Sequence, residues 1–451
     1  MLFTLVVKEL RENLMSLRFA ITAVVLMALA GVTVISLASE HRRQIDDYNR
    51  RVELHRKQAA EAGYAEPIVV DRPAPAFASL FKGIGSTLTN QISLKNFSPA
   101  RAIETVDIES TEAMFPLIDL GFLTGVVLSL VALLFSYDAI TGEKERGTLR
   151  QMLSNSISRP MIIISKWLSA FITLSVALII TLGLGSLLAA SLPRSPFSLR
   201  GEDYMVLATI MIAAMLYLSV FALMGILVSS IVSRSASSLA ILMLVWVMLI
   251  FVFPNAAPYL AVWLSPAPTR QQVIREEKQL GSGLLVELKD RHKKGAEQVV
   301  SEKLDGKEMQ KLAEGIDDTW ATEHKQAIDR LRENNLSELR QQEKVGKIIA
   351  SLSPYGAAAY AFAALSDSGQ AADERFFQLA RLYDQDQLTP YAKSFAAAPL
   401  GSKPAPPVFE YRPASLADRL ASASSEIVVL VTYNLALFIG CFVAFRRYDV
   451  R

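Results

Sequence analysis

The sequence predicts an all-α polytopic membrane protein with six transmembrane helices, an N-terminal interfacial helix and a mostly helical extracytoplasmic domain. The chain has 451 residues, 51% of them hydrophobic, and a mean hydropathy of +0.30. A soluble protein of this length is expected to carry more charge and a negative mean hydropathy. The apolar residues also gather in runs of about 20, the length that a helix needs to cross a hydrocarbon core roughly 30 Å thick.

The N-terminal residues 1–18 form an amphipathic pattern. Phe3, Val6 and Leu10 recur at spacings of three or four with charged side chains between them, which predicts an interfacial helix. The apolar runs that follow predict transmembrane helices at residues 19–39, 116–137, 161–192, 204–232, 237–264 and 427–445. The first run is longer than the hydrophobic region of a secretory signal, so we expect an uncleaved span.

Two long segments between the spans are expected outside the cytoplasm. The first covers residues 40–115, and its charged start keeps a helical period, so the first span should continue beyond the membrane until prolines break it. The second covers residues 265–425 and is rich in Glu, Lys, Arg and Gln up to about residue 347. No heptad is sustained there, which favours packed helices over a long coiled coil. Residues 351–398, richer in alanine and aromatic residues, are expected to form the core of this domain.

The positive charges of the short loops predict the orientation. Lysine and arginine prefer the cytoplasmic side of such loops. With both termini inside, the cytoplasmic segments carry Lys8, Arg11, Arg18, Lys144, Arg146, Arg150, Arg159, Arg234 and the tail 446–451, whereas the short outer loop holds Arg194 and Arg200. We therefore expect a multi-pass protein of the bacterial cytoplasmic (inner) membrane with both termini in the cytoplasm.

The short segment 138–160 carries the strongest functional signal. Gly142 and Gly147 permit tight changes of direction. Residues 143–146 offer both signs of charge within one helical turn, which suits docking on a soluble partner, and we expect Glu143 and Glu145 to be exposed. From the residues alone, a solvated loop of mixed charge is an equally good interpretation.

This segment resembles the cytoplasmic loop of ABC-2-type permeases, which commonly reads Asp, a few residues, then Gly-Glu-(Lys/Arg)-Glu-(Arg)-Gly-Thr-Leu. The pattern is met at Asp138, Gly142, Glu143, Lys144, Glu145, Arg146, Gly147, Thr148 and Leu149. The run Lys8-Glu9-Leu10-Arg11-Glu12 looks like the entrance helix of the same family, so the resemblance covers the whole membrane part.

The resemblance implies a permease that dimerises and sits on two ATP-binding subunits, with residues 143–149 as the element that couples to the ATPase. The long outer segments depart from the short members of the family, such as the permease associated with nitrous-oxide reductase maturation. Substrates of those small relatives are therefore not carried over to this chain.

The chain itself is expected to bind no ATP and no other cofactor. Gly142 and Gly147 have the spacing of a phosphate-binding loop, but Thr148 stands where that motif requires lysine, and no other stretch satisfies it. ATP and Mg would then belong to the partner subunit, and the chain would be no enzyme. The net charge of +2 gives no indication of nucleic-acid binding.

Other chemically interesting residues have plain interpretations. His41, His55, His292 and His324 have no second histidine or cysteine nearby in the sequence, so no metal site is expected, and we interpret them as solvated. The single cysteine, Cys441, lies in the last apolar run and should serve packing. Few ionisable residues fall in the spans, apart from Asp119 and Lys166 near their ends, which argues against an ion-coupled carrier.

Three functions remain open from the sequence. The first is the permease subunit of an ATP-driven exporter, working with a cytoplasmic ABC ATPase, a second permease copy or paralogue and the lipid bilayer. The second is a mechanotransmitting membrane subunit, which acts on a periplasmic partner without translocating a substrate. The third is a membrane receptor or scaffold that has no ATPase.

Overall fold

The computed structural model describes residues 2–62, 68–75, 77, 80–81, 90–95, 98–99, 119–154, 157–191, 201–303, 305–397 and 406–446. The expectations for residues 63–67, 100–118, 192–200, 398–405 and 447–451 lie outside the described residues. The chain divides into two compact units. One comprises Met1–Asn255 and Ala350–Arg451, and the other Ala256–Ile349.

Among the described residues, six helices are long and apolar enough to cross a membrane, which confirms the all-α polytopic fold. They follow the short helix α1 (Leu2–Leu14). In chain order they are α2 (Leu17–Ala62), α4 (Leu120–Phe122) with η1 (Leu123–Leu128) and α5 (Ser129–Ser136), α8 (Arg159–Ser191), α9 (Gly201–Ile231), α10 (Ser235–Val247) with η2 (Met248–Val252) and α11 (Phe253–Leu264), and α17 (Leu416–Arg446).

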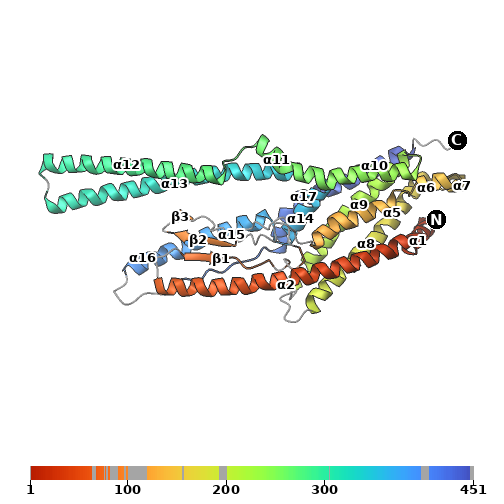
Figure 1. Ribbon diagram of the computed structural model, residues 1–451, viewed down its shortest axis with the longest axis horizontal. Coiled ribbons are helices and arrows are strands. Elements are labelled where there is room, and N and C mark those ends of the chain that lie inside the picture. Colours follow the sequence, from red (N-terminus) through yellow and green to blue (C-terminus); the bar gives the residue numbers. More distant parts are fainter. Residues whose placement is uncertain are drawn as a thin grey trace. The chain divides into compact units, whose positions relative to one another are not determined.

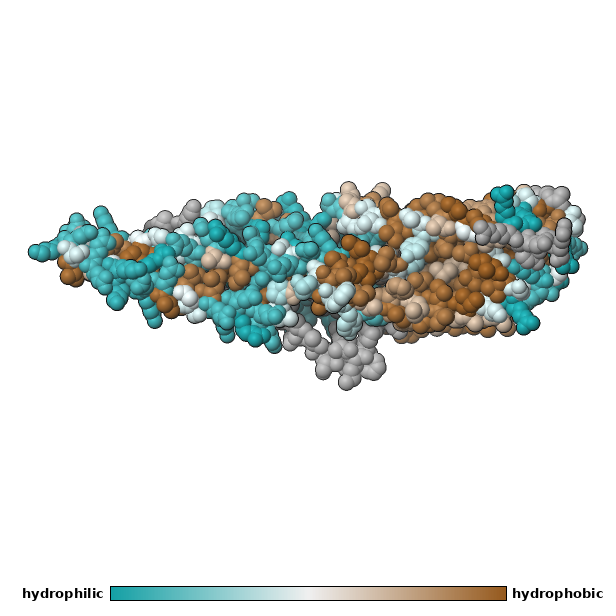
Figure 2. Space-filling model, turned by 90° about the horizontal axis from the view of Figure 1, so that it is seen from above, coloured by the Kyte–Doolittle hydropathy of each residue, from teal (hydrophilic) through white to brown (hydrophobic). Residues whose placement is uncertain are grey.

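The first unit contains a helix bundle around α9. Helix α9 is buried along most of its length, because α5, α8 and α17 all pack against it (Figure 1). Gly225 of α9 lies so close to α5 that a Cβ there would stand 1.9 Å from Ser136 Oγ. Small residues allow such close helix packing in membranes. The apolar surface in Figure 2 lies over these spans, and it gives way to hydrophilic residues where α6 (Thr141–Arg146) and α7 (Thr148–Ser154) lie, the α6 end of the bundle.

Helix α2 continues without a break from the apolar run into the charged stretch after it. No proline occurs between residues 17 and 62, and ion pairs such as Lys57–Glu53 at 2.7 Å support the charged part. The interpretation of His41 and His55 as solvated histidines is wrong. His41 is buried, and His55 Nδ1 lies 2.6 Å from an oxygen of Asp71, because both rings lie on the inward face of α2.

A small subdomain packs beside the charged half of α2, and we call it the outer subdomain because it lies away from the α6 end of the bundle (Figure 1). Its sheet consists of β1 (Ile68–Asp71), β2 (Gln91–Lys95) and β3 (Ser98–Pro99), antiparallel and in that order. Helices α15 (Gln370–Tyr383) and α16 (Thr389–Ala397), joined by η3 (Asp384–Leu388), complete it. Val70, Ile92 and Phe376 share its core. The sequence analysis predicted no strands in this region.

Helix α14 (Pro354–Leu365) packs inside the bundle, although the sequence analysis assigned residues 351–398 to the core of an outer domain. That assignment is wrong for α14, because its alanine-rich face fits tightly against α9 and α17. Ser353 donates to the carbonyl of Leu249 in η2, and Tyr433 of α17 donates to the carbonyl of Leu352. The ring of Tyr355 lies against Gly125 of η1, where a Cβ would stand 2.5 Å from it.

The contacts of α14 fix the depth of its first turn. Gly125, Leu249 and Tyr433 lie 12 to 14 residues from the α6 end of their spans, at Tyr137, Ser235 and Arg446. At 1.5 Å per residue this is about 20 Å along these candidate spans from the α6 end. A π-helix leaves a backbone carbonyl free. The hydroxyls of Tyr217 and Ser353 satisfy the carbonyls of Gly125 and Leu249 in this way.

The second unit is a two-helix hairpin formed by α12 (Arg270–Glu302) and α13 (Gly306–Ser351). These helices have 33 and 46 residues and pack against each other; the sequence analysis expected packed helices here but did not predict their length. The seam between them includes glycine, such as Gly295 beside Ile316, together with charged residues. Polar pairs also cross this seam: Arg332–Glu277 at 3.1 Å, His292–Asp317 at 2.8 Å and Arg291–Glu323.

The close approach of α9 to α5 predicts the effect of one methyl group. Gly225→Ala should destabilise the protein by about 1–3 kcal/mol, because the new Cβ overlaps Ser136. Gly31→Ala is the matched control, since a Cβ at Gly31 in α2 meets nothing within 4 Å and alanine favours a helix by about 1 kcal/mol. Thermal unfolding in detergent should show a lower midpoint for Gly225→Ala only. Equal midpoints would contradict the close packing.

Candidate functional site

The predicted coupling segment folds as two short helices. Helix α6 ends at Gly147, whose φ of 73° lies in the left-handed region that glycine tolerates. Helix α7 then starts in a new direction, with Leu149 buried among residues of α8, α9 and α17 such as Ile163 and Phe445. The segment is therefore an ordered part of the bundle and not a solvated loop.

The beginning of α6 is capped from another helix. The backbone N–H groups of Ile140 and Thr141 both donate to Oγ of Ser229, near the end of α9, at 2.9 Å. The first N–H groups of a helix have no partner within it, so a side-chain acceptor stabilises the start. A residue 88 positions away in the chain supplies that acceptor.

Helix α6 in turn caps the turn between α9 and α10. Lys144 Nζ donates to the carbonyls of Ser230 at 2.7 Å and Val232 at 3.1 Å, where α9 ends. The carboxylate of Glu145 accepts from the N–H of Ser235 at 2.7 Å and from its hydroxyl at 2.9 Å, where α10 begins. A cation at a helix C-terminus and an anion at an N-terminus both match the helix dipole. These reciprocal caps fix α6 to the α9–α10 turn.

A buried lysine joins α6 to two further helices. Lys166 of α8 lies 2.7 Å from a carboxylate oxygen of Glu143 and 3.0 Å from one of Glu9 in α1. The side chain of Lys166 is only 4% exposed and that of Glu143 only 8%. The expectation that Glu143 is exposed is wrong, because the carboxylate turns inward to the ammonium. Glu145, by contrast, is an exposed residue.

Two arginines attach the remaining spans to this end. Arg18 of α2 donates to Asp138 at 3.1 Å and to the hydroxyl of Tyr137 at 3.0 Å. Arg159, at the start of α8, donates to the carbonyls of Phe445 and Arg446 at 3.0 and 2.9 Å, which caps the end of α17. A displacement of α6 would therefore act on several spans at once.

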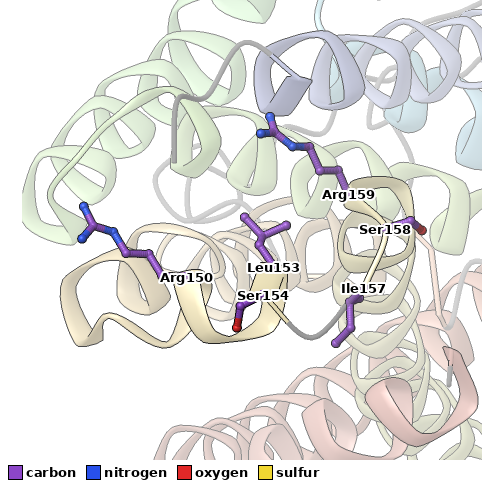
Figure 3. Close-up of a pocket in the computed structure, with 6 residues that line it drawn as sticks. All are labelled: Arg150, Leu153, Ser154, Ile157, Ser158 and Arg159. Carbon is purple, nitrogen blue, oxygen red and sulfur yellow. The ribbon is translucent and has the colours of Figure 1, made fainter. Parts of the chain in front are cut away.

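The outward surface of the segment is charged and partly hollow. The exposed residues of α6, α7 and the turn between them are Glu145, Arg146, Gly147, Thr148, Arg150, Gln151 and Ser154. A shallow groove of about 500 Å³ lies between α7 and the start of α8. Figure 3 shows its lining residues, with the side chains of Arg150 and Arg159 extending in a similar direction from two separate places on the chain.

The structure brings most of the predicted site residues together, but some of them are buried in the bundle and others are exposed. Gly142, Glu143 and Leu149 are buried, Asp138 and Lys144 are half-buried, and the other four are exposed. The sequence analysis missed Glu9, Ser229 and Ser235 as partners of the segment. A lysine in an apolar span requires a nearby acid, which is the signal that points from Lys166 to Glu9 and Glu143.

The described residues thus form a bundle of six candidate spans with a short, partly exposed helix at one end. The family model for the ABC-2 family transporter protein matches residues 3–450, so the chain belongs to the ABC-2 transporter family. The chain is also similar to the probable ABC transporter permease protein NosY of Stutzerimonas stutzeri, with 30% identity over 134 residues. That match covers 30% of this chain and 48% of the relative, about half its length. The protein is thus a multi-pass inner-membrane protein and a membrane subunit of an ABC transporter.

The buried lysine gives a direct test of this network. Lys166→Met should cost about 3–5 kcal/mol of stability, because it leaves the buried carboxylate of Glu143 and the half-buried carboxylate of Glu9 without their cation. Lys8→Met is the matched control, since Lys8 pairs with Glu12 at the surface, with side chains 55% and 60% exposed. An exposed pair contributes less than about 1 kcal/mol. Equal losses in chemical unfolding of the two variants would contradict the buried network.

Proposed function

We propose that this chain is the permease subunit of an ATP-driven transporter and that α6 and α7 couple it to a separate cytoplasmic ABC ATPase. The observation that carries this proposal is the attachment of α6. One short helix holds α8 through Lys166 and the α9–α10 turn through Lys144 and Glu145, while its outer surface stays exposed. A partner that moves this surface would move the spans behind it.

The tasks of the residues follow from their positions. Arg146, Thr148 and Arg150 are exposed and supply contacts to the ATPase, whereas Glu143 and Lys144 transmit its movement to the bundle. ATP and Mg would be held by the ATPase, and this chain supplies no catalytic group. The α6 end then faces the cytoplasm, with both termini on that side and the hairpin α12–α13 on the other. A second permease copy or paralogue completes the assembly.

Two kinds of output are consistent with this coupling. The chain either exports a cargo or performs conformational work on a periplasmic partner without transport. The uninterrupted helix α2, which extends from the α6 end into the outer subdomain, favours the second. The alternative is a receptor or scaffold without an ATPase, which would remain if the chain binds no ATPase.

Purification of the tagged chain in mild detergent, with mass spectrometry of the bound proteins, tests the assembly. We expect an ABC ATPase in about equal amount with the wild type. Arg146→Glu and Arg150→Glu should each weaken its binding about tenfold or more, because they reverse an exposed charge at the contact. Arg56→Glu, an exposed arginine in the outer half of α2, is the control and should retain the ATPase. A folded preparation without any ATPase would favour the receptor or scaffold.

Cysteine labelling of intact cells tests the orientation. The natural Cys441 is buried, so a cysteine placed elsewhere supplies the signal. A membrane-impermeant maleimide should label Lys307→Cys, near the tip of the hairpin, without lysis. Arg150→Cys in α7 should be labelled only after lysis. The reverse pattern would overturn the proposed orientation.

A further inference from the structure

Helix α2 connects the coupling segment to the outer subdomain through a polar contact at each end. We propose that α2 is a connecting rod that carries the movement of the coupling segment across the membrane to the sheet β1–β3. This inference rests on the proposed function and deepens it, because it assigns the route by which ATP-driven movement reaches the outside. The partner outside would then be a protein that binds the outer subdomain.

The inner joint of the rod is Arg18. Its guanidinium donates to the carboxylate of Asp138 at 3.1 Å, to the hydroxyl of Tyr137 at 3.0 Å and to the carbonyl of Leu134 at 3.5 Å. Asp138 opens the coupling segment, and the N–H of Gly142 in α6 donates to its carbonyl at 2.8 Å. A displacement of α6 therefore reaches the first turns of α2 directly.

The outer joint is Asp71, the last residue of β1. Its side chain is 3% exposed and lies 2.6 Å from Nδ1 of His55 and 3.5 Å from Nε of Arg51, both on α2. A buried carboxylate needs such partners, because an unpaired charge is costly to bury. The next residue, Arg72, pairs with Asp373 of α15 at 3.0 Å. The joint thus connects α2 to the sheet and the sheet to the outer helix α15.

The helix between the joints is continuous and keeps one inward face. Arg18 and Arg51 are 33 residues apart on one helix, a span of about 50 Å. Leu26, Val34, Leu37 and His41 are buried at helical spacing, so the face that packs in the bundle runs on toward the face that meets β1. A rigid helix fixed at both ends transmits translation and rotation, which a flexible linker does not.

The experiment compares the outer sheet with and without nucleotide in the complete complex. The chain is assembled in nanodiscs with its ATPase. The ATPase is a variant that binds ATP but does not hydrolyse it. Hydrogen exchange is followed by mass spectrometry in peptides that cover β1 and β2. In the wild type, ATP with Mg should change the exchange rate about fivefold or more, the lower range of typical couplings between sites.

Two variants interrupt the rod at different points, each with a matched control. Arg43→Pro breaks the helix at an exposed position, and Arg43→Ala keeps it. Asp71→Asn removes the charge of the outer joint, and Asp47→Asn removes a charge from the surface pair with Arg50. The response to ATP should be lost in Arg43→Pro and Asp71→Asn, and it should persist in both controls. Asp71→Asn decides the matter if Arg43→Pro does not fold.

The outcomes separate the rod from the proposed function. Every variant should still bind the ATPase, because none of the substitutions lies in α6 or α7. A response of wild-type size in Asp71→Asn, or a wild-type complex without any response, would overturn the rod and leave the ATPase coupling intact. A wild-type chain that binds no ATPase would overturn the proposed function and the rod together.

Discussion

A six-residue helix cannot stand alone in water, and α6 exists because other helices satisfy its ends. Ser229 caps its beginning, and Lys144 and Glu145 of α6 cap the end of α9 and the beginning of α10. Lys166 of α8 donates to the carboxylate of Glu143. The same contacts order the ends of the spans around it. The unpaired backbone groups at the ends of α6, α9 and α10 therefore find their hydrogen-bond partners in one another. These mutual caps hold the α6 end of the bundle together as one unit.

The outer subdomain is held in place by buried ion pairs in addition to its apolar core. It is small, and its core of Val70, Ile92 and Phe376 is supplemented by buried charges that pair across elements. Buried ion pairs contribute little net stability, but each demands a particular partner and so fixes geometry. Asp71 and Arg72 place β1 against α2 and α15 at once. These buried charges therefore fix the position of β1 more than they raise the stability of the subdomain.

Much of this fold follows from the sequence, for physical reasons. A run of about 20 apolar residues has few alternatives to a transmembrane helix. The cap on Thr141 comes from Ser229, and no local pattern announces a partner so distant. Glu143 was expected at the surface because carboxylates usually are, and only the position of Lys166 reverses that. The place of helix α14 inside the bundle was not predicted, because twelve residues are too few to cross a membrane. Its position along the bundle depends on contacts with η1, η2 and α17.

The position of α14 also sets an order for assembly. Its buried face, which includes Ala357, Ala358 and Phe362, lies in one core with Ala423 and Leu430 of α17, yet α17 follows α14 in the chain and leaves the ribosome after it. Until that span has been inserted, α14 has only part of its binding surface, and a partly buried apolar helix is prone to wrong association. Complete burial of α14 thus waits for the insertion of α17, and a chain interrupted before residue 416 would leave part of this apolar face uncovered.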